Sequence, residues 1–324
     1  MNGKMKAWNI YAPGDIRLET VDIPQVGAED VLLKVDAATS CGTDLKIYRR
    51  GHPGMKFPNR FGHEVTGWII EKGDKVNNVA IGDRVTTAAN GAFAEYVLVS
   101  PPPSLNELAI VPEGIPSEVA AMTEPFACAY HGTVESHIKL GDQVVVLGCG
   151  PIGLMFIKLA KLSGAFVIAT DVINGRLEAA IKVGADRIVN SKDVKDPIQA
   201  VKDLTDGGSG VDVAIEAVGL PIAWEQGLYM IRPGGLVTFF GGCKAGTTVT
   251  LDTTFIHYQE AHMQGIFNYH HPEHFFEAFK LIRRGALDPQ VFITDHAGLD
   301  DVEEVFKRLA EGYEGIKIAI HVNR

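Results

Sequence analysis

The sequence lacks the features that mark several specialised classes of protein. It has no uninterrupted apolar run of about 18 residues, which a membrane-spanning helix would need. The segment from Met1 to Lys6 lacks the hydrophobic core of a signal peptide. Positive charge is not in excess either, because the formal net charge is −10 and binding to nucleic acid needs clustered Lys and Arg. These absences predict a cytoplasmic protein that binds neither membranes nor nucleic acid.

Cysteine is also scarce, and the sequence contains no internal repeat and no low-complexity tract. The four cysteines are scattered along the chain, at Cys41, Cys128, Cys149 and Cys243. No two of them have a paired spacing, so a disulfide framework is not expected.

The remaining composition is that of a globular protein large enough for two hydrophobic cores, with 324 residues of which 46% are hydrophobic. The first third is rich in short apolar runs separated by Gly, Pro and Asp turns, which predicts β-strands. From about Ser136 to Phe267, apolar runs such as 143–147 and 166–170 alternate with helical patterns. This alternation predicts an α/β domain with a doubly wound parallel sheet.

A glycine pattern lies at the first turn of that domain. The residues Gly148, Gly150 and Gly153 form a G-x-G-x-x-G pattern that also includes Pro151 and Ile152. The pattern follows a predicted strand and opens a predicted helix, where unpaired N–H groups favour the phosphates of a dinucleotide. The alternative is a glycine-rich turn in a domain that binds no nucleotide.

An acidic residue supports the dinucleotide interpretation. Asp171 ends the second strand, 18 residues after Gly153, where a carboxylate can accept both ribose hydroxyls and would repel a 2′-phosphate. NAD is therefore favoured over NADP, although the nearby Arg176 could partly offset this preference. The predicted cofactor-binding set also includes Val218 and Gly241.

Four side chains in the N-terminal part of the sequence are of types that bind zinc: Cys41, His63, Glu64 and Glu124. Three protein ligands and a water are typical of a catalytic zinc site. The spacing alone does not decide whether these residues bind a metal, because they lie in separate predicted loops. A buried cysteine and a solvent-facing histidine are as good an interpretation of the spacing.

Short motifs over nearly the whole chain resemble those of the zinc-dependent medium-chain dehydrogenases, in the sorbitol and threonine dehydrogenase branch. In chain order the matching segments are Cys41-Gly42-Thr43-Asp44, Gly62-His63-Glu64, Gly82-Asp83-Arg84-Val85, Phe93-Ala94-Glu95-Tyr96, the dinucleotide pattern and Gly315-Ile316-Lys317. The resemblance implies a GroES-like β-rich catalytic domain from residues 1–135 and 268–324, interrupted by a Rossmann NAD-binding domain at 136–267.

The resemblance also implies roles for the four candidate ligands. Cys41 and His63 are expected to bind zinc directly. Glu64 is a zinc ligand in the sorbitol-like branch. In other branches the residue at this position does not bind zinc directly and lies next to the ligands. Glu124, at a position where alcohol dehydrogenases have a second cysteine, is expected to bind zinc directly or through water, as in polyol dehydrogenases. A four-cysteine lobe that holds a structural zinc in many relatives is missing after Val85, so one catalytic zinc per chain is expected.

Other residues take catalytic or substrate roles in the same resemblance. Thr43 corresponds to the hydroxyl residue that contacts the substrate oxygen, and Asp44 to a partner of the ligand imidazole. Lys46 stands where many relatives have the histidine that ends the proton relay, and His52 is a possible substitute.

Two further residues are candidates for contact with the substrate. Tyr48 follows the first ligand motif, and Asn268 follows the last strand of the Rossmann domain. For each, an ordinary packing or turn residue is the alternative. The basic loop that carries Arg49, Arg50, Lys56 and Arg60 could hold an anionic substrate, but a solvated surface loop is the better interpretation.

Together these observations predict an NAD-linked enzyme that uses zinc as a Lewis acid to oxidise a secondary alcohol reversibly to the ketone. A polyol, inositol or sugar-type alcohol is the favoured substrate, and threonine or a small diol is the alternative. A zinc-free enone reductase of the same fold and a non-catalytic NAD-binding protein are the competing classes. The resemblance implies a homodimer or homotetramer, in which the strand near 265–268 pairs across subunits.

Overall fold

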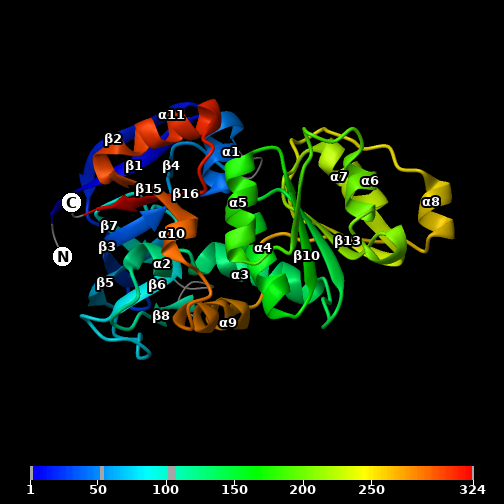
Figure 1. The fold of residues 1–324 in the computed structure, drawn as a ribbon. Coiled ribbons are helices and arrows are strands. Elements are labelled where there is room, and N and C mark those ends of the chain that lie inside the picture. Colours follow the sequence, from blue (N-terminus) through cyan, green and yellow to red (C-terminus); the bar gives the residue numbers. More distant parts are fainter. Residues whose placement is uncertain (1–2, 52–54, 101–106, 323–324) are drawn as a thin grey trace. The chain divides into compact units, whose positions relative to one another are not determined.

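The computed structural model describes residues 3–51, 55–100 and 107–322. The chain divides into two compact units (Figure 1). Unit 1 contains Met1–Ala127 and His271–Arg324, and unit 2 contains Cys128–His270. The predicted domain limits at 135/136 and 267/268 stay a prediction beside these bounds. Within the described ranges, none of the helices is both long and apolar enough to cross a membrane.

Unit 1 is built mainly from β-strands. Its strands are β1 (Lys4–Ala12), β2 (Asp15–Asp22), β3 (Val31–Thr39), β4 (Asn59–Arg60), β5 (Glu64–Lys72), β6 (Arg84–Ala88), β7 (Tyr96–Val99), β8 (Ala109–Ile110), β15 (Ile293–Gly298) and β16 (Lys317–His321). One sheet has the order β2-β1-β4, and a seven-stranded sheet has the order β15-β16-β3-β5-β6-β8 with β7 paired to β3. The C-terminal strand β16 pairs antiparallel with β3, so the two ends of the sequence complete one sheet.

Short helices cover the strands of unit 1: α1 (Gly42–Arg50), α2 (Ser117–Ala121), α9 (Pro272–Arg283), α10 (Pro289–Phe292), the 3₁₀ turn η3 (Leu299–Asp301) and α11 (Val302–Gly312). Phe306 of α11 packs into the core against Phe61 and Phe93, with ring centroids 4.7 and 5.7 Å away. Helix α3 (Thr123–Glu135) begins in unit 1 and continues into unit 2.

Unit 2 contains one parallel sheet. Its strands are β9 (Gln143–Leu147), β10 (Phe166–Asp171), β11 (Arg187–Asn190), β12 (Val211–Glu216), β13 (Ile231–Phe239) and β14 (His262–Gly265). Their order is β11-β10-β9-β12-β13-β14. The central strand β9 is buried along Val144–Leu147, as expected for a strand covered on both faces.

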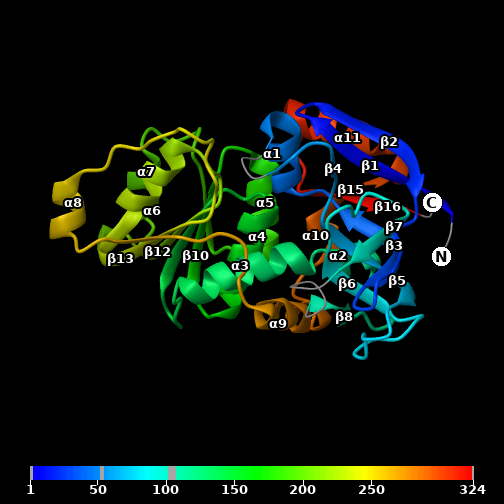
Figure 2. The same ribbon diagram turned by 180° about the vertical axis from the view of Figure 1, so that it is seen from behind.

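Helices lie on both faces of this sheet: α4 (Pro151–Leu162), α5 (Asn174–Val183), α6 (Pro197–Lys202) and α7 (Pro221–Met230). The short helix α8 (Thr253–Tyr258) lies farther from the sheet (Figures 1 and 2). Figures 1 and 2 show α4 and α5 on one face and α6 and α7 on the other. Successive strands run outward from β9 to β11 and then from β12 to β14, so the strand order reverses between β9 and β12. The predicted doubly wound α/β fold is confirmed.

Candidate metal centre and cofactor site

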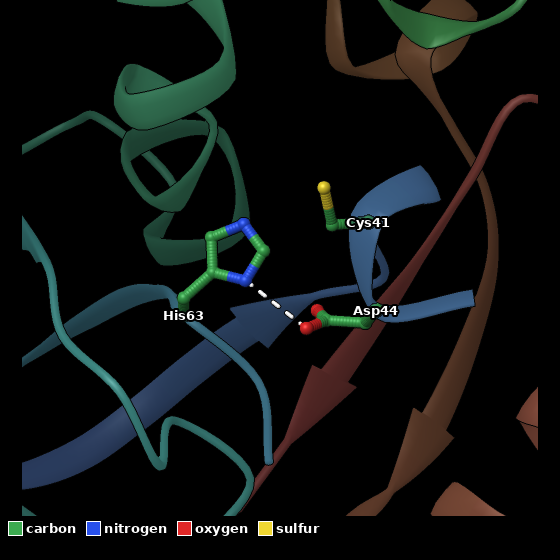
Figure 3. Close-up of side chains that lie close together, drawn as sticks. All are labelled: Cys41, Asp44 and His63. Atoms are coloured by element: carbon green, nitrogen blue, oxygen red, sulfur yellow. Dashed lines mark hydrogen bonds and ion pairs between the residues drawn. The ribbon is translucent and has the colours of Figure 1, made fainter. Parts of the chain in front are cut away.

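The imidazole of His63 lies at the centre of a cluster of metal-binding side chains in unit 1. Its Nδ1 is 3.1 Å from Oδ1 of Asp44, and its Nε2 is 3.9 Å from Oε2 of Glu124. Figure 3 shows Cys41, Asp44 and His63 turned toward one another, with the Asp44 carboxylate against one ring nitrogen. A carboxylate in this position orients an imidazole so that its other nitrogen can bind a metal.

Two overlapping groups of side chains place their ligand atoms within 4.8 Å of one another: Cys41, Asp44 and His63, and His63, Glu64 and Glu124. His63 belongs to both groups. In the described ranges, every group of three or more such side chains includes this histidine. The four sequence-predicted ligands are therefore brought together around it.

Local structure explains how separate segments supply these groups. Cys41 is the N-cap of α1, where its Sγ accepts a hydrogen bond from the Thr43 N–H at 3.4 Å, and Asp44 lies in the first turn of that helix. Glu64 begins β5 and Glu124 lies in the first turn of α3. Ends of helices and strands supply all four positions, as is common for functional sites on a rigid scaffold.

A buried ion pair lies directly behind the cluster. Lys317, 1% exposed, places its Nζ 2.6 Å from Oε2 of Glu64 and donates to the Ser40 carbonyl at 2.7 Å. The Thr39 hydroxyl also donates to Glu64 Oε2. Burial lowers the pKa of Lys317, but the negative charges of Glu64 and Cys41 outweigh it and raise that pKa.

Lys317 is a residue of the site that the sequence did not predict, although it ends the Gly315-Ile316-Lys317 motif. A lysine inside an otherwise apolar closing strand was the available signal, because an almost fully buried lysine needs a partner.

The residues present fit a zinc ion. Oδ2 of Asp44 and Oε1 of Glu64 are buried and have no hydrogen-bond partner within the described parts of the chain. Such unsatisfied oxygens are costly, and a bound cation would offset that cost. Thiolate, imidazole and carboxylate together form a donor set typical of catalytic zinc.

The charges in the cluster shift the pKa values of two candidate ligands. Burial and the charge of Glu64 raise the pKa of the Cys41 thiol. Burial lowers the pKa of His63, but the charges of Asp44 and Cys41 raise it by more than burial lowers it. The pKa of His63 therefore lies well above its usual value. A bound zinc ion favours the opposite forms, because a thiolate and a neutral imidazole are what ligate a metal.

The glycine pattern of unit 2 forms the turn between β9 and α4. Gly148 has a φ of +93°, and Gly150 is the N-cap of α4 with Pro151 at its first position. A Cβ at Gly153 would collide with the Gly148 carbonyl, whereas a Cβ at Gly150 would meet no atom within 4 Å. Gly153 therefore serves close packing, and Gly150 leaves open space where a phosphate can approach.

Asp171 is held beside this turn by backbone donors. Its Oδ2 accepts a hydrogen bond from the Cys149 N–H at 2.7 Å, and its Oδ1 accepts from the N–H groups of Val172 and Ile173 at 2.7 and 3.0 Å. Three donors fix the position of the carboxylate at the carboxyl end of β10. Ile152 and Arg176 lie in α4 and α5, and Val218 and Gly241 follow β12 and β13 at the same edge of the sheet.

The structure does not test the three residues predicted to contact the substrate. Tyr48 is 8% exposed and its ring lies 5.8 Å from that of Phe306, so it packs in the core. Asn268 has a φ of +59° and its Oδ1 accepts hydrogen bonds from the Tyr269 N–H and the Cys128 thiol. Their substrate roles stay predictions, and His52 lies outside the described residues.

The basic loop is used in part for structure. Arg49 donates from Nη2 to the carbonyls of Leu309 and Ala310 near the end of α11. One of the four cations therefore stabilises a helix end. The prediction of a surface loop is wrong for three of them, because Arg49 and Arg50 lie in the last turn of α1 and Arg60 lies in β4.

Comparison with known proteins matches both units. Residues 27–108 match the alcohol dehydrogenase GroES-like domain, and residues 151–284 match the zinc-binding dehydrogenase family. The chain is 34% identical over 349 residues to L-threonine 3-dehydrogenase of Pyrococcus horikoshii, which covers 97% of this chain and 98% of the relative. The chain belongs to the zinc-binding alcohol dehydrogenase superfamily.

Two other members of this superfamily extend the comparison. Sorbitol dehydrogenase of Bacillus subtilis is 29% identical over 354 residues, which covers 99% of this chain and 98% of the relative. The crystal structure of 2R,3R-butanediol dehydrogenase from Bacillus subtilis superimposes with a TM-score of 0.88 at 28% identity, covering 98% of this chain and 100% of that structure. The predicted family and branch are confirmed, and the chain is an NAD(P)-dependent, zinc-binding oxidoreductase that acts on CH–OH groups.

Proposed function

We propose that this dehydrogenase oxidises a secondary alcohol of a polyol, inositol or sugar-type substrate reversibly to the ketone, with NAD and one catalytic zinc per chain. The observation that carries the proposal is the pair of carboxylates, Glu64 and Glu124, within 4.8 Å of the His63 ligand atom. In the resemblance, Glu64 is a ligand in the sorbitol-like branch. Glu124 stands where alcohol dehydrogenases have a second cysteine and where polyol and sugar dehydrogenases carry Glu.

Cys41 and His63 would hold the zinc together with Glu64, Glu124 or both. When bound, zinc supplies Lewis acidity toward the substrate oxygen, and NAD accepts the hydride. The chain's own residues orient these parts. Asp44 fixes the ring of His63, and Lys317 fixes the carboxylate of Glu64. Thr43, in the N-terminal turn of α1, would take the hydroxyl proton outward from the substrate.

A second candidate substrate is L-threonine or a small diol. The relative from Pyrococcus horikoshii is named an L-threonine 3-dehydrogenase and is more identical to this chain than the sorbitol dehydrogenase is. The chemistry at the reacting carbon is the same, so only a direct test of substrates separates the two candidates.

The test is a screen for NAD reduction over polyols, inositols, sugars, threonine and diols, with and without a zinc chelator. We expect a polyol or sugar alcohol to give the highest kcat/KM, and we expect the chelator to abolish turnover until zinc is restored. NADP should be reduced more slowly, because the charge of Asp171 opposes a 2′-phosphate. Activity that a chelator does not affect would contradict the zinc assignment, and preference for threonine would select the second candidate.

A matched pair of cysteine variants tests the metal site itself. Cys41→Ser should lose zinc, measured by metal analysis, and at least about 1,000-fold in kcat, since it removes a ligand on which the Lewis acidity depends. NADH affinity should change little. Cys243→Ser, a substitution outside the cluster, is the control and should retain both zinc and turnover.

A further inference from the structure

A fully buried carboxylate, Glu216, lies at the carboxyl end of the central strand β12. Its exposed fraction is 0%, and its Oε1 accepts hydrogen bonds from the N–H groups of Val218 and Gly219 at 2.8 and 2.7 Å. Its backbone carbonyl accepts from the N–H groups of Phe240 and Gly241 at 3.0 and 2.9 Å. One residue therefore holds the loop that follows β12 and the loop that follows β13.

The loop after β9 meets the same position. A Cβ at Gly148 would lie 2.7 Å from Cγ2 of Val218, and a Cβ at Gly241 would lie 2.5 Å from Oε2 of Glu216. Glycine at both places allows the three loops to approach one another around the carboxylate. Trp224 fixes the far side of the third loop, because its indole N–H donates to the Gly241 carbonyl at 3.1 Å.

These loops lie where the strand order of the sheet reverses. Strands β9 and β12 are neighbours in the sheet although β10 and β11 lie between them in the sequence. In doubly wound sheets a dinucleotide binds across the crevice at this point. Asp171, the candidate ribose acceptor, is on the β10 side of the glycine turn, so the β12 and β13 loops are on the side left for the nicotinamide half.

We propose that Glu216 is a positioning residue for the nicotinamide half of the cofactor. The inference rests on the proposed function, since it assumes that this unit binds NAD. Burying a carboxylate is costly unless its hydrogen bonds are made, and here the donors to its Oε1 are two N–H groups of the loop beside the cofactor turn. Glu216 sets the conformation of residues 218 and 219 and, through its carbonyl, that of residue 241.

The test separates the two halves of the cofactor. NADH and ADP-ribose, which lacks the nicotinamide, are titrated by calorimetry into wild type, Glu216→Ala and Glu216→Gln. We expect Glu216→Ala to weaken NADH at least 10-fold while ADP-ribose changes less than 3-fold. Glu216→Gln keeps an acceptor for the Val218 and Gly219 N–H groups and should recover most of the loss. Asp171→Asn is the matched carboxylate control and should weaken both ligands alike.

The outcomes distinguish this inference from the proposed function. Equal weakening of NADH and ADP-ribose in Glu216→Ala, with a lowered Tm, would make Glu216 structural and would overturn the inference. Unchanged NADH affinity in Glu216→Ala would overturn it as well. If Glu216→Ala does not fold, Glu216→Asp, which withdraws the carboxylate by one methylene, should show the same selective loss for NADH. Wild-type protein that binds neither ligand would instead refute NAD binding and the proposed function.

Discussion

At the scale of single residues, the two oxygens of the Glu64 carboxylate have different surroundings in the candidate metal centre. Glu64 directs Oε2 to Lys317 and to the Thr39 hydroxyl, while its Oε1 is buried without a hydrogen bond within the described chain. One oxygen is thus anchored by the protein, and the other keeps its lone pairs available for a cation. A carboxylate held in this way can serve a metal without free rotation.

Replacement of Lys317 tests this anchoring. Lys317→Met should destabilise the zinc-free protein by about 3–5 kcal/mol, because it leaves Glu64 as a buried charge without its cation. The measurement is the free energy of unfolding in urea. The double variant Lys317→Met/Glu64→Gln should regain much of the loss, since neither charge remains. If the loss in the double variant equals the sum of the losses in Lys317→Met and Glu64→Gln, the ion pair is not what stabilises this position.

At the scale of secondary-structure elements, the strand–turn–helix around the glycine pattern separates folding from binding. The same substitution has different consequences at two of its glycines, because only one of them is packed. Gly153 faces the Gly148 carbonyl, and Gly150 faces open space. The sequence predicted both roles from the pattern, and the structure supplies the contacts that explain them.

Alanine substitutions at these two positions should therefore diverge. Gly153→Ala should lower the Tm by several degrees, because α4 must move away from β9 to relieve the collision. Gly150→Ala should leave the Tm unchanged and weaken NADH at least 10-fold, since its methyl group fills the approach of the phosphates. Thermal unfolding and NADH titration measure the two effects. A Gly150→Ala variant with full NADH affinity would argue against a phosphate at this turn.

An ion pair between α4 and the start of β11 gives a second prediction at this scale. Asp186 accepts hydrogen bonds from Lys161 Nζ and from the Val167 N–H, both at 2.7 Å. Partial burial raises the pKa of Asp186, but these hydrogen bonds and the charge of Lys161 outweigh it and lower the pKa. A carboxyl group whose pKa is lower in the folded state stabilises the fold above its unfolded pKa, about 3.9.

Asp186→Asn should reduce the free energy of unfolding by about 1 kcal/mol at neutral pH, a modest value because both side chains are 29% exposed. The difference from wild type should begin to shrink as the pH falls below about 4, where the unfolded chain binds a proton, and should vanish only below the lower pKa of the folded carboxyl group. Denaturant unfolding at several pH values measures it. The exposed Asp193→Asn is the control, and a difference that does not shrink at all as the pH falls would contradict the assignment.

At the scale of the whole molecule, β14 leaves one edge of the parallel sheet without a partner strand in the described chain. Its exposed Met263 and the neighbouring Phe267 are 41% and 71% accessible. Edge strands of this kind either are protected or pair with another chain. The resemblance to dehydrogenases predicts pairing with a second copy.

We therefore expect a dimer or tetramer by light scattering after size-exclusion chromatography. Phe267→Lys should raise the dissociation constant at least 10-fold, because it places a charge in an apolar contact. Tyr258→Lys, an exposed aromatic position on α8 outside this edge, is the comparison. A wild-type protein that is monomeric at micromolar concentration would refute the predicted assembly.

The sequence alone determined the fold class and the glycine turn and predicted Cys41 and His63 as zinc ligands, because local patterns and motif order carry that information. Periodicity fixes which segments are strands and helices, and a motif names its own residues. The sequence did not determine how Glu64 and Glu124 are arranged around His63, since Glu64 begins β5 and Glu124 lies in the distant helix α3.

The tertiary structure alone decided which buried charges meet. Lys317 reaches Glu64 only because β16 pairs with β3, and Glu216 meets the loops after β9 and β13 only because strands distant in the sequence are neighbours in the sheet. Such contacts depend on the pairing of distant segments, and no local pattern encodes that pairing.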